Sequence, residues 1–189
     1  MSKTSYNVAS TVRASILSFA LLLNAACAGA SIQSAPQNLS NESYRVDSGD
    51  TLNVTIFGQN DLGGKFLVGA EGAITIPLAG AVPVREKTLI EVKEAVESAL
   101  SPRFVTDAKA SVEVSEYRPY FVFGEVTRAG KFAFTPGLTV QQAIATAGGL
   151  NYRAAKDDAF ITRNQQRLRG NYQTPLLPGD TVEVPPRYF

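Results

Sequence analysis

Residues 120–150, YFVFGEVTRAGKFAFTPGLTVQQAIATAGGL, decide the fold because they predict a complete strand–strand–helix unit. The aromatic and β-branched residues at 120–123 are typical of a strand that is packed on both faces. Gly130 can take the positive φ of a reversing turn, after which residues 131–134 return as a second short strand. Pro136 and Gly137 predict the next turn, which leads into a helix.

Both ends of this helix are marked in the sequence. Thr139 is the expected N-cap, and Gln142 three residues later completes a capping box. Four apolar residues fall on one helical face and predict its core side: Val140, Ala143, Ile144 and Ala147. Gly148 and Gly149 are expected to end the helix, at least one of them with positive φ. No residue of the unit is an expected catalyst, which favours a binding or assembly module.

The preceding region, residues 44–117, predicts an α+β unit with strands on both sides of one helix. Residues 52–56 alternate apolar and polar side chains, as a half-buried strand does. Further strands are expected at residues 66–68, 73–76 and 110–115. A helix over residues 89–100 begins at a second capping box, formed by Thr88 and Glu91.

The end of the chain repeats a motif from its start. After two further strands expected at 159–163 and 165–169, the sequence PGDTVEV at 178–184 repeats SGDTLNV at 48–54. We expect two structural turns, made by Gly49 with Asp50 and by Gly179 with Asp180, in which each carboxylate accepts hydrogen bonds from backbone amides of its own turn. This role is favoured over a metal or catalytic one. The repeat predicts that the first and last strands are equivalent pieces of one framework, with residues 175–189 returning to the first region.

The first 30 residues predict a secretory signal peptide. Lys3 and Arg13 precede a short apolar stretch that is followed by small residues. Cys27 occupies the position of a lipidated cysteine in a bacterial lipobox, although Asn24 departs from that pattern. Cleavage after Ala30 by an ordinary signal peptidase is the alternative. Residues 31–43 are small and polar and predict a flexible tether.

Composition excludes several function classes. The chain has no histidine and one cysteine, which excludes serine–histidine and cysteine–histidine catalysis, histidine metal sites and an internal disulfide. No cofactor motif is present, so neither a cofactor nor a metal is expected. The net charge is +1, and it falls to −1 without Lys3 and Arg13, so a nucleic-acid partner is not expected.

The motifs, taken in order, resemble the bacterial outer-membrane polysaccharide export family. They are YRVDSGDTLNVTIFG, GAITIPLAG, the helix at 89–100, SVEVSEYRPYFVFGEV, FTPGLTVQQAIATAGGL and LPGDTVEVPPRYF. The resemblance implies an α+β fold of small mixed sheets, with an export domain at 44–117 and a soluble-ligand-binding β-grasp domain at 118–174. Ala129, in place of the usual proline, and residues 84–87 depart from the family's turns.

The resemblance also implies partners and a location. Proteins of this family form rings or channels for capsular or exopolysaccharide, and many contact an inner-membrane polysaccharide co-polymerase. Longer members end in a helix that crosses the outer membrane, whereas this sequence stops at Phe189. We therefore expect a short-form homo-oligomer in the periplasm, associated with the outer membrane by its lipid anchor and working with a separate outer-membrane β-barrel.

Three functions compete at this point. The first is an export component that guides a polymer without reacting with it, and the second is a periplasmic glycan-binding adaptor. Four tyrosines are candidate glycan contacts, with core or interface packing as the alternative: Tyr117, Tyr120, Tyr152 and Tyr172. The third is a hydrolase or lyase using Asp157 and Asp158, and it is the weakest because adjacent carboxylates do not converge on one bond.

Overall fold

The computed structural model describes residues 44–156 and 158–187. These residues all belong to one of the two compact units into which the chain divides, Ile32–Phe189. The predicted signal peptide, the predicted lipidation site Cys27, the predicted tether at 31–43 and Asp157 lie outside the described residues.

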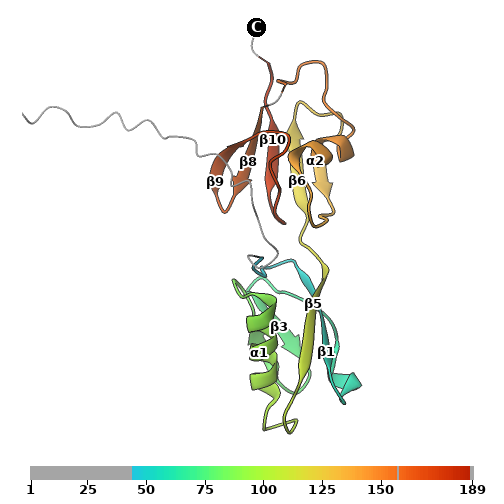
Figure 1. Ribbon diagram of the computed structural model, residues 1–189, viewed down its shortest axis with the longest axis vertical. Helices are drawn as coiled ribbons and strands as arrows, with labels where there is room; N and C mark the ends of the chain where they lie inside the picture. Colours follow the sequence, from blue (N-terminus) through green and yellow to red (C-terminus); the bar gives the residue numbers. More distant parts are fainter. Residues whose placement is uncertain (1–43, 157, 188–189) are drawn as a thin grey trace, which may run out of the picture. The chain divides into compact units, whose positions relative to one another are not determined.

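The described residues form an α+β fold of three small sheets, as the sequence predicts (Figure 1). In chain order the elements are β1 (Thr51–Ile56), η2 (Asn60–Leu62), β2 (Gly64–Leu67), β3 (Ala73–Ile76), β4 (Gly80–Pro83), α1 (Leu89–Leu100), β5 (Ala110–Glu116), β6 (Tyr120–Gly124), β7 (Gly130–Phe132), α2 (Val140–Thr146), β8 (Ala159–Arg163), β9 (Gln166–Gly170) and β10 (Thr181–Val184).

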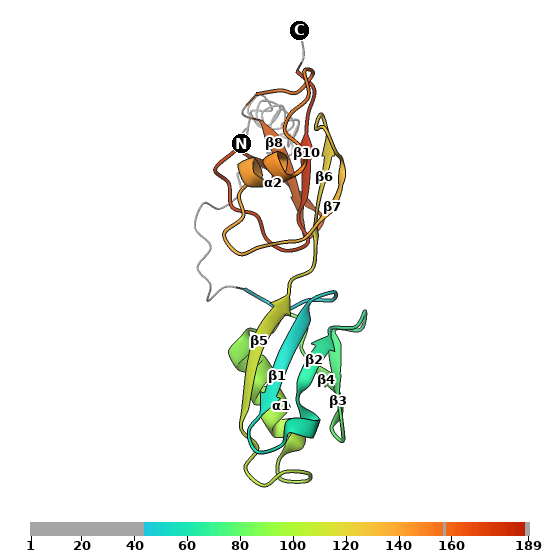
Figure 2. The ribbon, with the colours of Figure 1, turned by 90° about the vertical axis from the view of Figure 1, so that its right-hand side faces the viewer.

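The first hydrophobic core lies between α1 and two antiparallel sheets. One sheet has the order β2-β1-β5, and the other is the hairpin β3-β4 (Figure 2). Alternate residues of β1 enter the core and meet the apolar stripe of α1; they are Leu52, Val54 and Ile56 from β1 and Val92, Val96 and Leu100 from α1. The predicted helix and its Thr88–Glu91 capping box are confirmed.

The hairpin strand β4 is an element that sequence reasoning missed. It pairs with β3 through a turn in which Leu78 and Gly80 adopt positive φ values of 66° and 77°. Pro77 and Gly80 are turn-forming residues, but a leucine with positive φ is uncommon, so the sequence alone does not indicate a tight hairpin here.

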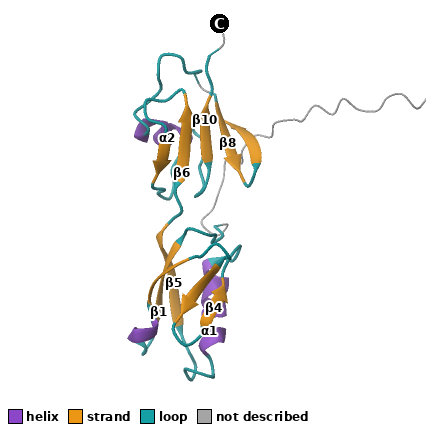
Figure 3. Ribbon diagram, turned by 180° about the vertical axis from the view of Figure 1, so that it is seen from behind, coloured by secondary structure: helices purple, strands orange, loops and turns teal. Residues whose placement is uncertain are grey.

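The second hydrophobic core lies between α2 and a five-stranded sheet of order β7-β6-β10-β8-β9. Strands β6 and β10 are parallel and the other neighbours are antiparallel, as Figure 3 shows for β6, β10 and β8. The predicted core side of α2 is confirmed, because Val140, Ala143 and Ile144 are buried in this cluster.

The end of α2 has the geometry that its two glycines predict. Gly148 and Gly149 have φ values of 86° and 83°. Gly148 N–H donates to the Ala145 carbonyl at 3.0 Å, and Gly149 N–H donates to the Ile144 carbonyl at 2.9 Å. These two bonds are those of a Schellman motif, and the Thr139–Gln142 capping box at the other end is also present.

The position of β10 corrects one expectation. The prediction that residues 175–189 return to the first domain is wrong for Thr181–Val184, which pairs with β6 on one side and β8 on the other. Val182 lies level with Val122 and Ile161, so these three side chains form one row of the second core. Strands β1 and β10, which follow the two Gly-Asp turns, are therefore equivalent pieces of two different sheets.

The parallel pairing of β6 with β10 requires a glycine at the end of β6. Gly124 has a φ of 93°, and a Cβ added there would overlap the Val184 carbonyl oxygen. Both the backbone conformation and the close approach of β10 thus exclude a larger residue.

Gly124→Ala should therefore lower the free energy of unfolding by at least about 1 kcal/mol more than Gly137→Ala does. Gly137 is the matched control, because its φ is also positive (81°) but no atom lies within 4 Å of the added Cβ. Urea unfolding of the two variants measures the difference, and equal values would show that the close approach to β10 is absent.

Candidate functional site

The chemistry-bearing residues of the described chain centre on the two Gly-Asp turns. In the first turn Gly49 has a φ of 92°, and Asp50 N–H donates to the Asp47 carbonyl at 3.2 Å. The Asp50 carboxylate accepts the Asp47 N–H at 2.9 Å. The predicted bond from the carboxylate to its own turn is therefore present.

The second turn repeats this geometry. Gly179 has a φ of 85°, and Asp180 N–H donates to the Leu177 carbonyl at 3.1 Å. The Asp180 carboxylate accepts the Leu177 N–H at 2.7 Å. Each turn is followed by a strand with the same alternating burial, so the repeat in sequence is a repeat in structure.

The first aspartate is fully buried, and its carboxylate accepts four hydrogen bonds. Besides Asp47 N–H, Asp50 accepts the Tyr44 hydroxyl at 2.5 Å, Arg118 N–H at 2.8 Å and Arg118 Nη1 at 3.0 Å. Burial, followed by the bond to Asp50, raises the pKa of Tyr44, so its hydroxyl stays a donor at neutral pH.

The second aspartate is paired with a different arginine. Asp180 is 1% exposed and accepts Arg163 Nε at 2.9 Å and Arg163 Nη2 at 2.7 Å, a bidentate pair. Arg163 also donates to the Pro175 carbonyl at 3.2 Å. With the bond from Leu177, this carboxylate holds three hydrogen bonds.

Sequence reasoning missed both arginines. The signal that could have found them is the aspartate itself, because a carboxylate that opens a buried strand must be matched by a cation. Spacing along the chain gives no such signal, since Arg118 is 68 residues from Asp50 and Arg163 is 17 residues from Asp180.

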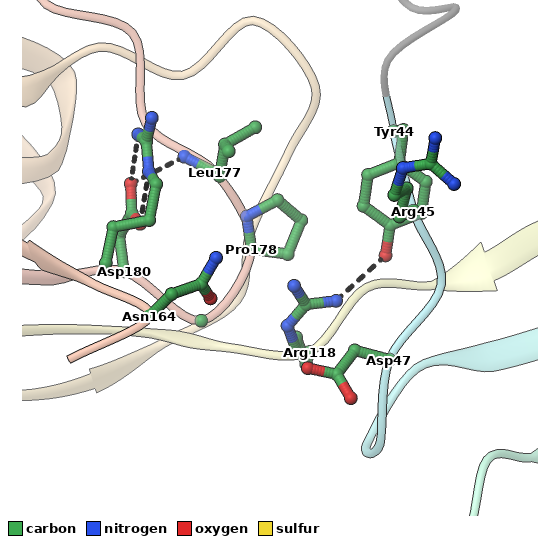
Figure 4. A pocket seen from close by; sticks show the side chains of 10 residues that line it. Tyr44, Arg45, Asp47, Arg118, Asn164, Leu177, Pro178 and Asp180 are labelled. Carbon is green, nitrogen blue, oxygen red and sulfur yellow. Dashed lines mark hydrogen bonds and ion pairs between the residues drawn. The ribbon is translucent and has the colours of Figure 1, made fainter. Parts of the chain in front are cut away.

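Arg118 lies against both turns. A Cβ added to Gly49 would be 3.4 Å from Arg118 Cβ, and one added to Gly179 would be 2.8 Å from Arg118 Nε. A cavity of about 410 Å³ adjoins this arginine, and Figure 4 shows Arg118 reaching the Tyr44 hydroxyl there. Its polar lining includes Arg45, Arg163 and Asn164. The buried carboxylates are occupied by hydrogen bonds, so this arrangement supports a structural role for them.

The four tyrosines proposed as glycan contacts have different environments. Tyr120 is 1% exposed and stacks on Phe132 at 5.7 Å, so the glycan-contact expectation is wrong for this residue and core packing is confirmed. Burial raises its pKa. Tyr117 packs edge-on against Tyr44 at 5.2 Å and Phe134 at 5.5 Å.

The other two tyrosines, Tyr172 and Tyr152, also differ from each other in their surroundings. Tyr172 packs against the second core, and its hydroxyl is buried without a hydrogen-bond partner among the described residues. Tyr152 is 82% exposed and stays a predicted glycan contact. The structure therefore gathers no tyrosine platform in the described part of the chain.

Of the two adjacent carboxylates considered for polymer cleavage, Asp158 lies within the described residues. Asp158 is ion-paired with Arg169 at 2.8 Å. No group of three or more potential ligands that could hold a metal ion occurs in residues 44–156 and 158–187. Within the same ranges no helix has the length and apolar character needed to cross a membrane.

Comparison with known proteins divides the chain at the same linker that contains Arg118. The polysaccharide biosynthesis/export protein family matches residues 38–115, and the SLBB domain matches residues 119–176. The exopolysaccharide production protein ExoF of Rhizobium meliloti (strain 1021) is 31% identical over 137 residues, which cover 69% of this chain and 32% of that protein.

A second relative has the same level of identity. The EPS I polysaccharide export outer membrane protein EpsA of Ralstonia nicotianae (strain ATCC BAA-1114 / GMI1000) is 31% identical over 106 residues, which cover 54% of this chain and 28% of that protein. The chain thus spans about a third of the length of these curated relatives.

The buried ion pairs of the two turns predict a large effect of neutralising either aspartate. Asp50→Asn and Asp180→Asn should each lower the free energy of unfolding by about 2–4 kcal/mol, because each leaves a poorly exposed arginine without its counter-charge. Asp158→Asn is the matched control, since it removes an exposed pair worth at most about 1 kcal/mol. Equal unfolding midpoints for all three variants in urea would contradict the structural role of the turns.

Proposed function

Because the chain belongs to the polysaccharide biosynthesis/export protein family, we propose that it guides an exopolysaccharide out of the periplasm without reacting with it. The observation that carries this proposal is the order of the two matched regions, residues 38–115 and 119–176, which follow each other across a linker of three residues. The names of both relatives, which refer to exopolysaccharide production and to polysaccharide export, support the same role.

The hydrogen bonds made by the buried carboxylates support a transport role in which the protein does not react with the polymer. Glycoside cleavage requires a carboxylic acid and a carboxylate that can both reach the scissile bond. Asp50 and Asp180 are instead held by arginine and backbone donors in their turns. Both carboxylates are already engaged by these donors, and we propose that the protein is not an enzyme.

The proposal includes location and assembly. We place the protein in the periplasm, held at the outer membrane by a lipid on Cys27, and the outer-membrane protein EpsA among its relatives supports this location. We infer a homo-oligomer around the polymer path, because surrounding a path needs side-to-side contacts between copies that close into a ring. An inner-membrane polysaccharide co-polymerase and a separate outer-membrane protein would supply the two ends of that path.

Deleting the gene in the producing bacterium tests the function. We expect the secreted polymer to disappear while its synthesis continues, because the path and not the polymerase is removed. The wild-type gene should restore secretion with the protein in the membrane fraction. Cys27→Ser should release the protein into the soluble periplasmic fraction and lower secretion. Quantifying secreted and cell-associated polymer in each strain gives the result.

Each other outcome points to a different role. Normal secretion by the deletion strain would defeat the export function. Polymer that is secreted but no longer retained at the cell surface would favour the glycan-binding adaptor. Polymer of altered chain length, produced also when the purified protein is mixed with it, would favour an enzyme. Membrane retention of Cys27→Ser would exclude the lipid anchor and leave the export role standing.

A further inference from the structure

The five-stranded sheet has one face toward the second core and an opposite face that carries exposed aromatic residues. Side chains alternate between the two faces of a strand, so the neighbours of buried Tyr120 and Val122 on β6 point away from the core. These neighbours are Phe121, which is 42% exposed, and Phe123, which is 45% exposed. We call the side of the sheet that carries them the outer face.

Strand register shows what surrounds the two rings. Phe121 lies level with Lys131 on β7 and Thr181 on β10. Phe123 lies level with Glu183 on β10, and Glu183 is in turn level with Phe160 on β8. Residues that are level on neighbouring strands point to the same face. The outer face thus presents aromatic rings next to short and long polar side chains.

Charged side chains of the outer face lie next to its aromatic rings, and most of them are paired. Arg167 lies over the Phe160 ring at 3.8 Å and is ion-paired with Glu183 at 2.9 Å, while Arg169 is paired with Asp158. Lys131 has no ion-pair partner among the described residues, and it is level with Phe121. The outer face therefore has one uncompensated positive charge, and this charge adjoins an exposed aromatic ring.

We propose that the outer face binds pyranose units of an acidic polysaccharide, with sugar rings on Phe121 and Phe123 and a sugar carboxylate at Lys131. The inference rests on the proposed function and adds a binding surface and a class of polymer to it. A pyranose ring has a face of polarised C–H groups, which the negative face of an aromatic ring attracts, and an equatorial rim of hydroxyls that hydrogen-bond to polar neighbours. The unpaired ammonium of Lys131 complements a uronate or ketal carboxylate.

A second copy of this chain fits the outer face less well. The cores of protein–protein interfaces are depleted in lysine, glutamate and aspartate. Here Lys131, Glu183 and Asp158 border the rings, and burying them would cost desolvation that partly exposed ion pairs barely offset. A hydrated polymer with hydroxyls and carboxylates leaves these groups in contact with water.

Half-exposed phenylalanines also suit a polymer that must move. Each half-exposed ring offers one weak contact, so one sugar unit binds weakly and leaves readily. A long chain compensates because many weak contacts act together.

Electrophoresis of the purified full chain through gels that contain polymer tests this proposal. Polygalacturonate is the acidic probe and dextran is the neutral one. We expect polygalacturonate to retard the wild-type protein more strongly than dextran. Phe121→Ser and Phe123→Ser should each weaken the binding to polygalacturonate by about 5-fold, the value for losing one ring contact. Lys131→Gln should remove most of the preference for the acidic polymer.

Phe57→Ser is the matched control. Phe57 is also exposed, but it lies just after β1, a strand of the three-stranded sheet β2-β1-β5. It should be retarded like the wild type, and circular dichroism should show that all variants are folded. No retardation of the wild type by either polymer would overturn the proposal, as would equal retardation of Phe121→Ser, Phe123→Ser and Phe57→Ser. A loss of oligomer mass in Phe121→Ser with unchanged retardation would assign the outer face to contacts between copies.

The gel result and the deletion result are independent. Normal secretion by the deletion strain would defeat the export function even if the purified protein binds polygalacturonate. Absence of binding in the gel with loss of secretion in the strain would overturn only the outer-face proposal.

Discussion

A buried aspartate at the start of a central strand is the constraint on which the three-stranded and the five-stranded sheet each depend. Strand β1 lies between β2 and β5, and β10 lies between β6 and β8, so both are paired on two sides. Asp50 and Asp180 fix where these strands begin by accepting hydrogen bonds from their own turns. The carboxylates remain buried only because Arg118 and Arg163 neutralise them. Arg118 also lies in the linker between the two matched regions, so one ion pair holds both a turn and that linker.

Local features of the sequence predicted local features of the structure. Three kinds of feature were predictable: the two capping boxes, the glycine end of α2 and the two Gly-Asp turns. Each is determined by residues that are close together in the sequence. Features that depend on contacts between distant parts of the chain were not predictable from the sequence. Nothing near Thr181 indicates that β10 inserts between β6 and β8, and the close approach at Gly124 exists only once they are paired. The arginine partners of the aspartates also lie far from them in sequence, at 68 and 17 residues.

The difference between local and long-range features also explains why the candidate binding residues changed from tyrosines to phenylalanines. The sequence offers four tyrosines as candidate sugar contacts, with core or interface packing as the alternative. In the structure Tyr120 is buried and Tyr117 packs against other rings. Which residues of β6 face outward depends on the side of the sheet that α2 covers, and this is a tertiary property. The exposed aromatic residues of that strand are phenylalanines, and they share their face with lysine, arginine and glutamate. The buried carboxylates thus serve the fold, and the outer face is left for a ligand.

The central claim is that this chain touches the polymer while the polymer leaves the cell. Photo-crosslinking in actively secreting bacteria tests it most directly, with p-benzoylphenylalanine introduced at position 121 and, as the control, at position 57. The account predicts that irradiation joins the protein to polysaccharide at position 121 only, seen as a high-mass smear that stains for sugar and disappears when synthesis is blocked. Adducts only with other proteins, or equal polysaccharide adducts at both positions, would contradict it.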